Sequence, residues 1–346
     1  MKKTTLMKFT LITLAAGILC VNAQAQSMHF SQYYAAPMLL NPANTALTSE
    51  NDYRVGINAR NQWATVPVPY NTISAFADCK LFHNEENNNW LGIGAAFFND
   101  VAGDGNLSLA RYEGFAAYHL GIGDKNMISV GGSFGYVQRS VNFGALTFDQ
   151  QWDGLSFNPS LSNGEKNYVA KTTYTTIGAG INYAYFPNEN TYIKAGFGLA
   201  NINQPKESFY NSSTNQINMR PTVNVDGIFQ INEFWALNPS VYYTTQGGAY
   251  ELVYGSLVNI RLNAGAEKHT EVILGAFNRI NDAVIGAAGL RWNGFQAIAS
   301  YDLTISKLAP YTSGYGAMEF SLIYQGNYGN LSFTHEPRRT MNCPRF

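Results

Sequence analysis

The sequence predicts an all-β fold: a transmembrane antiparallel β-barrel of about 14 strands, with a short N-terminal segment and a C-terminal periplasmic tail. Charged residues make up only 13% of the 346-residue chain and aromatic residues 14%, whereas ordinary soluble domains carry about 25% charged residues. After residue 25 no run of about 18 apolar residues occurs, which excludes membrane-spanning helices. Instead, apolar and polar residues alternate along segments of 9 to 14 residues, which predicts strands that can cross a bilayer.

Residues 1–25 have the pattern of a signal peptide. Lys2, Lys3 and Lys8 precede an apolar run over 9–21, and Ala23-Gln24-Ala25 is a small-residue cleavage site. We therefore expect an exported protein whose mature chain begins with an N-terminal lead-in segment, residues 26–52.

The three cysteines leave two alternatives open. Cys20 suggests a lipoprotein, although the bulky Leu19 before it disfavours lipidation. After signal cleavage, Cys79 and Cys343 remain, as a single disulfide or as free thiols.

The barrel is predicted over residues 53–324. In 53–63, for example, Val55 and Ile57 fall on one face, and Arg54 and Arg60 fall on the other. A barrel in lipid turns the apolar face outward, whereas a soluble sandwich would bury it. The predicted strands are 53–63, 70–81, 89–98, 106–119, 127–137, 173–185, 190–200, 221–231, 234–245, 250–263, 270–278, 282–291, 294–302 and 316–324.

The connections favour the membrane alternative. Every second connection has seven residues or fewer, and the long ones, 138–172, 201–220 and 303–315, all have the opposite parity. Outer-membrane barrels have short periplasmic turns and longer external loops. Aromatic residues near strand ends are predicted to lie at the membrane interfaces: Trp63, Tyr70, Trp90, Phe97, Phe98, Tyr185, Phe186, Phe234, Trp235, Tyr242, Tyr243, Trp292 and Tyr324.

The inward face carries charges of both signs, which would either pair or line a water-filled pore. They are Arg54, Arg60, Asp78, Arg111, Glu113, Asp226, Glu251, Arg261 and Arg291.

No catalytic or metal-binding constellation stands out, and no cofactor is expected. Gly131–Gly135 matches G-x-S-x-G but lies inside a predicted strand, with no helix after the serine. The five histidines lack metal-ligand spacing. Asp100 and Asp104 suit either a tight turn or a calcium ion, and the turn is favoured. A formal charge of -1 argues against a nucleic-acid partner.

An ordered set of motifs spans the mature chain: 29–34, Pro37 with 40–43, Tyr53-Arg54, 60–63, Pro67 and Pro69, 97–100 with Gly103, and the terminal Cys343-Pro344-Arg345-Phe346. This set resembles the PorP/SprF family of outer-membrane proteins of the type IX secretion and gliding machinery. The resemblance implies an outer-membrane barrel, in contact with outer-membrane lipid, that assists a large secreted surface protein with a C-terminal secretion domain. It implies no catalysis.

The family-motif residues are the candidates for partner contact: Gln32, Tyr33, Asn41, Pro42, Arg60, Trp63, Cys343, Pro344, Arg345 and Phe346. The segment around 28–44 would act as a plug or docking element, or would cap the barrel base. The tail, 325–346, is predicted to be a periplasmic extension that holds other machinery, with a flexible terminus as the alternative. The rival functions are a porin or transporter for small solutes and a secreted soluble β protein.

Overall fold

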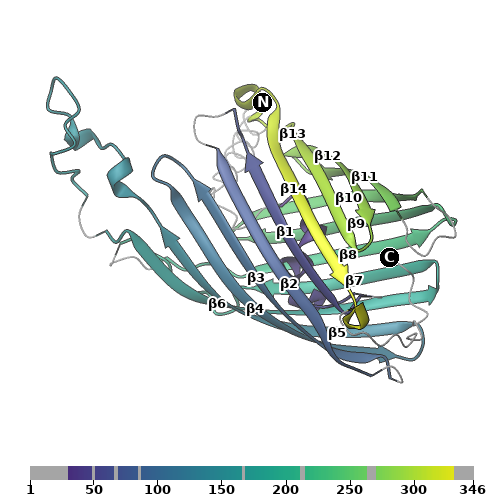
Figure 1. The fold of residues 1–346 in the computed structure, drawn as a ribbon. Helices are drawn as coiled ribbons and strands as arrows, with labels where there is room; N and C mark the ends of the chain where they lie inside the picture. Colours follow the sequence, from purple (N-terminus) through teal and green to yellow (C-terminus); the bar gives the residue numbers. More distant parts are fainter. Residues whose placement is uncertain are drawn as a thin grey trace, which may run out of the picture.

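Fourteen antiparallel strands close into a single barrel in the computed structural model, which describes residues 30–48, 51–65, 69–84, 87–165, 168–210, 215–262 and 270–330 (Figure 1). Each strand pairs with its neighbours in sequence, and β1 pairs with β14 to close the sheet. The strands are β1 (Tyr53–Gln62), β2 (Tyr70–Asn84), β3 (Asn89–Ala102), β4 (Leu107–Ile122), β5 (Asn126–Ser140), β6 (Lys171–Asn188), β7 (Thr191–Ala200), β8 (Arg220–Gln230), β9 (Trp235–Gln246), β10 (Ala249–Arg261), β11 (Thr270–Arg279), β12 (Ala283–Trp292), β13 (Phe295–Thr304) and β14 (Tyr315–Gly326).

All fourteen predicted strands are present, so the predicted fold is confirmed. The largest difference at a strand end is at β3, which continues four residues further, to Ala102; β2, β4, β5 and β6 each continue three residues further, β4 to Ile122. Ladder hydrogen bonds keep these ends paired where the alternation of residues fades. Among the described residues, no helix is long and apolar enough to span a membrane.

The long connections, 141–170, 201–219 and 305–314, all lie at one end of the barrel, as their parity predicts. In Figure 1 the connection after β5 projects well beyond the strands. Because outer-membrane barrels carry their longer loops outside, we call this the external end and the other the periplasmic end.

The outward face is apolar along most strands. In β1, Val55 and Ile57 are 47% and 53% exposed, whereas Asn58 and Arg60 point into the lumen and are buried. This is the face that a membrane barrel presents to lipid.

We expect Ile57→Arg, at the middle of β1, to cost about 2–4 kcal/mol, because it places a charge near the bilayer midplane. Unfolding by urea from lipid vesicles measures this cost. Leu155→Arg, in the external connection after β5, is the matched control and should change the unfolding free energy by less than about 0.5 kcal/mol. Equal effects of the two substitutions would contradict a lipid-facing position for Ile57.

The interface prediction is wrong for four aromatic residues. Trp90, Phe98, Phe186 and Tyr242 are 2–5% exposed and point into the barrel. They do so because the lumen is not wholly polar: apolar residues of the N-terminal segment pack against the wall there. The predicted interface aromatics that are exposed are Tyr70, Tyr185, Trp235, Tyr243 and Trp292, and Phe234 is partly exposed where it lines a cavity inside the barrel.

Candidate functional site: a plug inside the barrel

Residues 30–48 fold inside the barrel as three short turns, and we call this segment the plug. The turns are η1 (Tyr33–Ala35), α2 (Pro37–Leu40) and η2 (Pro42–Asn44). Each proline begins its turn, where its missing N–H is not needed, and the Asn41 side chain accepts a hydrogen bond from the Ala43 N–H to cap η2. In Figure 1 the plug is the purple segment enclosed by the strands.

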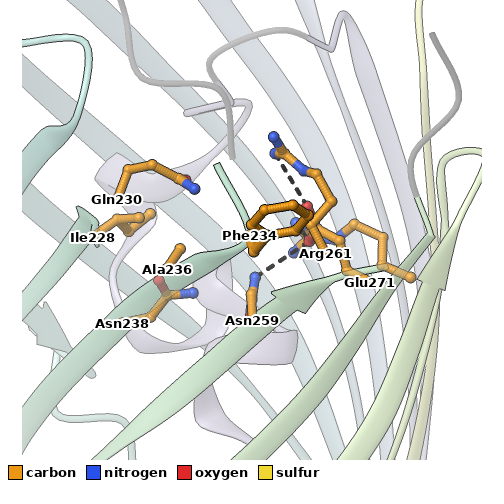
Figure 2. Close-up of a pocket in the computed structure, with 9 residues that line it drawn as sticks. Ile228, Gln230, Phe234, Ala236, Asn238, Asn259, Arg261 and Glu271 are labelled. Atoms are coloured by element: carbon orange, nitrogen blue, oxygen red, sulfur yellow. Dashed lines mark hydrogen bonds and ion pairs between the residues drawn. The ribbon is translucent and has the colours of Figure 1, made fainter. Parts of the chain in front are cut away.

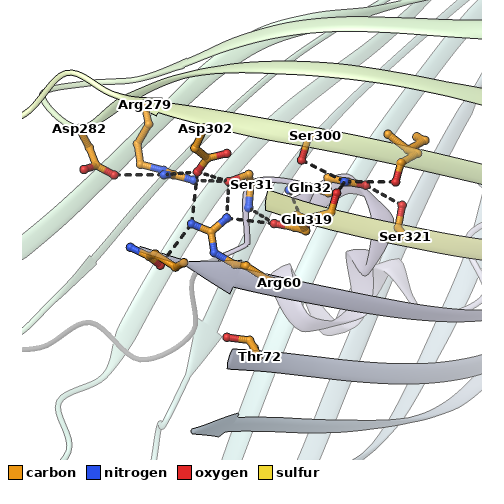
Figure 3. A network of polar contacts seen from close by, with 12 residues as sticks. Ser31, Gln32, Arg60, Thr72, Arg279, Asp282, Ser300, Asp302, Glu319 and Ser321 are labelled. Carbon is orange, nitrogen blue, oxygen red and sulfur yellow. Dashed lines mark hydrogen bonds and ion pairs between the residues drawn. The ribbon is translucent and has the colours of Figure 1, made fainter. Parts of the chain in front are cut away.

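Four buried charged side chains that are far apart in the sequence meet near the external end of the lumen (Figure 3). Arg60 lies 3.2 Å from Asp302 and 3.1 Å from Glu319, and Arg279 lies 3.0 Å from Asp302. None of these side chains is more than 3% exposed. We call these four residues the luminal charge cluster. They come from β1, β11, β13 and β14.

The first residues of the plug bind directly to this cluster. The Ser31 N–H donates to Glu319 Oε2 (2.8 Å) and the Ser31 hydroxyl donates to Asp302 (2.6 Å), while Arg60 donates to the Ser31 oxygen (2.6 Å). The Gln32 N–H donates to Glu319 Oε1 at 3.0 Å. Buried charges need such partners, so the plug completes the cluster as much as the cluster holds the plug.

The Gln32 side chain extends this network along β13 and β14. Its amide donates to the Ser300 hydroxyl (3.0 Å), and its carbonyl oxygen accepts from Ser321 (2.6 Å). Both wall serines point inward in the alternation of their strands. The plug is therefore fixed in register against the closing seam of the barrel.

The other end of the plug is held near the periplasmic end of the lumen. The Ala46 N–H donates to Asp78 (2.7 Å), and the Trp90 indole donates to the Ala46 carbonyl oxygen (3.0 Å). His119 contacts the Thr45 carbonyl oxygen at 2.8 Å. The plug thus runs down the lumen, from the external half to the base.

The middle of the plug lies directly against the wall. The Asn41 amide donates to Asn182 of β6 at 2.8 Å. A Cβ atom at Gly131 of β5 would lie 2.6 Å from the backbone of Pro42 and Ala43. Glycine at this position permits the close approach.

Apolar contacts cover the side of the plug that faces β9–β12. The Tyr33 ring packs 4.5 Å from Tyr242 and 6.1 Å from Phe277, and Val253 and Ile285 complete this cluster. Burial raises the pKa of the Tyr33 phenol well above its usual range. Tyr33 therefore stays neutral, and its hydroxyl contacts Ser240.

The structure brings five of the predicted site residues together inside the lumen. Gln32, Tyr33, Asn41, Pro42 and Arg60 are all buried there. Partner contact through these side chains stays a prediction, and it requires the plug to move.

The other predicted site residues lie elsewhere. Trp63 follows β1 at the external end, half-buried and edge-on to Tyr70 at 5.5 Å. Four lie outside the described residues: Cys343, Pro344, Arg345 and Phe346. The predicted signal peptide, 1–25, lies wholly outside them, and so does the predicted tail beyond residue 330.

Ser31, Arg279, Asp302 and Glu319 were missed as site residues. The usable signal for such a residue is a charged side chain at an inward-facing position of a strand whose other residues are mostly apolar, as at Glu319 in β14.

The predicted inward charges do point into the lumen, and they pair. Arg54 binds Asp78, Arg111 binds Glu113, and Lys194 lies 3.4 Å from Asp226. Ion pairing, the first of the two alternatives, is therefore the arrangement of the described wall.

The described residues contain no group of three side chains that could hold a metal ion. Gly131–Gly135 lies within β5, as predicted. Asp100, which was a candidate for a tight turn or a calcium site, accepts a hydrogen bond from the Thr72 hydroxyl through its carboxylate. Cys79 forms no disulfide with a described residue, and its pairing with Cys343 stays a prediction because that residue lies outside the described ranges.

The family model for the type IX secretion system membrane protein PorP/SprF matches residues 22–324. The chain belongs to the PorP/SprF family. The match confirms the resemblance that the motifs indicated, and membership of a type IX secretion family implies partners in that machinery. The PorP/SprF family and the barrel fold are those of a secretion membrane protein rather than of an enzyme class.

Solved structures of similar fold are also membrane barrels. The Ralstonia pickettii toluene transporter TbuX is 12% identical with a TM-score of 0.52, over 84% of this chain and 93% of TbuX. The monoaromatic hydrocarbon channel CymD is 10% identical with a TM-score of 0.51, over 87% and 93%. At such identities the likeness shows the fold alone. No curated protein sequence matches the chain. Family and fold together place this PorP/SprF protein in the outer membrane.

Proposed function

We propose that this barrel supports the secretion or surface anchoring of a large type IX substrate, such as a gliding adhesin with a C-terminal secretion domain. Its role is binding, without catalysis. The observation that carries the proposal is an exposed apolar loop tip at the external end, formed by Trp152, Leu155 and Phe157, which are 58%, 92% and 42% exposed. Exposed apolar side chains that cluster in this way mark sites of protein contact.

The loop tip has a defined shape. Trp152 and Phe157 form an antiparallel bridge, and the Asp153 carboxylate accepts the N–H groups of Leu155 (2.8 Å) and Ser156 (2.7 Å). These hydrogen bonds lower the pKa of Asp153. A turn held in this way presents Leu155 to solvent at little further entropic cost on binding.

The two longest external connections are joined to each other. Tyr168 and Tyr210 form a bridge, Arg139 pairs with Glu207, and the Tyr210 hydroxyl donates to Glu165 at 3.0 Å. The hydrogen bond to Glu165 raises the pKa of Tyr210. Because the two connections are joined to each other and to a closed barrel, they form a rigid surface to which an external protein could bind under mechanical load.

The rival function is a transporter for small solutes. The plug lies in the lumen and is bound at both ends by buried hydrogen bonds. This arrangement favours a binding role over free diffusion. Two of the solved barrels of similar fold are described as a toluene transporter and a hydrocarbon channel, so conductance of the intact protein must be measured beside binding.

We expect Trp152→Ser with Leu155→Ser to reduce capture of the co-expressed surface substrate at least tenfold, because two exposed apolar anchors contribute about 1.5–3 kcal/mol each when buried. Pull-down with the tagged barrel from outer membranes measures this. Phe82→Ser removes a side chain that is 84% exposed at the periplasmic end and serves as the matched control. Unchanged capture, together with stepwise conductance of the unmodified protein, would favour the transporter.

A further inference from the structure

A small cavity lies on the luminal side of the barrel wall at the periplasmic end (Figure 2). The plug contacts described above do not involve its lining residues. Its volume is about 60 Å³, enough for a group of carboxylate size. It lies where β8, β10 and β12 end and where β9 and β11 begin. The lining residues used below are Ile228, Phe234, Asn259, Arg261, Glu271 and Arg291.

Among the described residues that line this cavity, the charges do not balance. Glu271 of β11 pairs across the sheet with Arg261 of β10 on one side and with Arg291 of β12 on the other. Their guanidinium groups approach the Glu271 carboxylate at 3.4 Å and 3.1 Å. Arg291 otherwise donates to the neutral Gln296, at 2.7 Å. Two cations therefore share one anion in a site where both are less than one-third exposed.

Two of the lining residues also carry buried polar atoms that have no partner in the described structure. Arg261 Nε and Asn259 Oδ1 are buried without a hydrogen-bond partner in the described structure, and Asn259 is only 7% exposed. Such groups are costly to leave unpaired. One is a donor that suits a carboxylate, and the other is an acceptor that suits a peptide N–H.

An apolar wall adjoins the arginines. Phe234 and Ile228 line the cavity beside the charged row, and Phe234 is 39% exposed. A free inorganic anion would leave this wall unused. A lipid headgroup would have to leave the outer face of the barrel and enter the lumen.

We propose that this cavity binds an acidic peptide segment of a periplasmic partner, with one carboxylate between Arg261 and Arg291 and a neighbouring apolar side chain against Phe234. Arginine pairs recognise carboxylates through charge-assisted hydrogen bonds. This site lies at the end opposite the loop tip, so it is independent of the proposed contact with the surface substrate.

The test uses the purified full-length barrel in detergent and a labelled peptide, blocked at both ends, with one glutamate flanked by phenylalanines. Fluorescence anisotropy should show Arg261→Gln and Arg291→Gln each weakening binding about tenfold, which corresponds to about 1.4 kcal/mol. Glu271→Gln removes the competing carboxylate and should strengthen binding. Arg139→Gln, at the external end, is the matched control and should leave binding unchanged. Heat-modifiable migration confirms that each variant is folded.

The same peptide with glutamine in place of glutamate should bind at least tenfold more weakly. Equal binding of the two peptides would overturn the proposal, as would unchanged binding in both arginine variants. Inorganic phosphate and acetate, added as competitors, identify the remaining alternative: if they bind as tightly as the peptide, the cavity is a simple anion site and the peptide proposal is wrong. Binding weakened by Glu271→Gln would also contradict it.

Discussion

Deleting residues 30–46 is expected to turn the closed barrel into an ion-conducting pore. The wall closes through backbone pairing of β1 with β14, and this pairing does not involve the plug. The plug contacts wall side chains, such as those of Glu319 and Asp78. Without it, the luminal charge cluster becomes hydrated and lines a polar channel, as in porins.

Single-channel recording in planar bilayers measures this change. The intact protein should show no steps, and the deletion variant should show discrete ones. Removal of residues 151–158, which contain the loop tip, is the matched control and should leave the bilayer silent. A folded deletion variant without conductance would show that wall side chains alone close the lumen. If the deletion variant no longer shows heat-modifiable migration, the plug is needed for folding of the barrel. That result would contradict the argument that the wall closes without the plug.

The same deletion separates the two interpretations of the plug in cells. If the barrel inserts correctly but export of the surface substrate stops, the plug acts as a docking element. If export continues at its usual level, the segment only fills the lumen. Immunoblotting of the substrate in the culture medium and at the cell surface distinguishes these results.

The wall of the barrel could be predicted from the sequence almost completely. Alternation with period two assigned Arg54 and Arg60 to the lumen and Val55 and Ile57 to the outside, and the structure agrees. Alternation also predicted the number of strands, and the parity of loop lengths predicted the external end. Both signals are local, because each strand pairs with its sequence neighbour.

The contents of the lumen could not be predicted in the same way. Alternation assumes that an inward residue faces water, so it does not account for the apolar Val253 on the inward face of β10, and it assigned Trp90 to an interface. Both are buried against the plug or beside it. A segment of 19 residues with its own apolar side chains changes the environment of the wall, and no feature of the strands themselves reports its presence.

The luminal charge cluster depends on contacts across very long sequence separations. Ser31 meets Glu319 across 288 positions and Arg279 across 248. A single sequence gives the identity of these residues and their inward parity, but not the vertical alignment of one strand with another. That alignment follows from the register of fourteen strands and from the shear of the closed barrel.

Arg60→Met is expected to destabilise the barrel by about 3–5 kcal/mol, because removing one partner leaves buried charges uncompensated. Of the described contacts, Glu319 would keep the plug N–H groups of Ser31 and Gln32, and Asp302 would keep Arg279 and the Ser31 hydroxyl. Urea unfolding from vesicles measures the loss, and limited proteolysis of the plug should become faster. The variant should also conduct intermittently, since the plug is held less firmly.

Asp282→Asn is the matched control for this prediction. Asp282 pairs with Arg279 of the same cluster at 3.1 Å, but its side chain is 38% exposed, and exposed pairs contribute only about 0–1 kcal/mol. A double-mutant cycle of Arg60→Met with Glu319→Gln should give a coupling energy of about 1–3 kcal/mol, as for residues in one network. If Arg60→Met is no more destabilising than Asp282→Asn, the cluster is hydrated, and charge pairing is not what fixes the plug. The dry cluster described here requires a large difference between the two substitutions, because the same ionic contact is strong only where water is excluded.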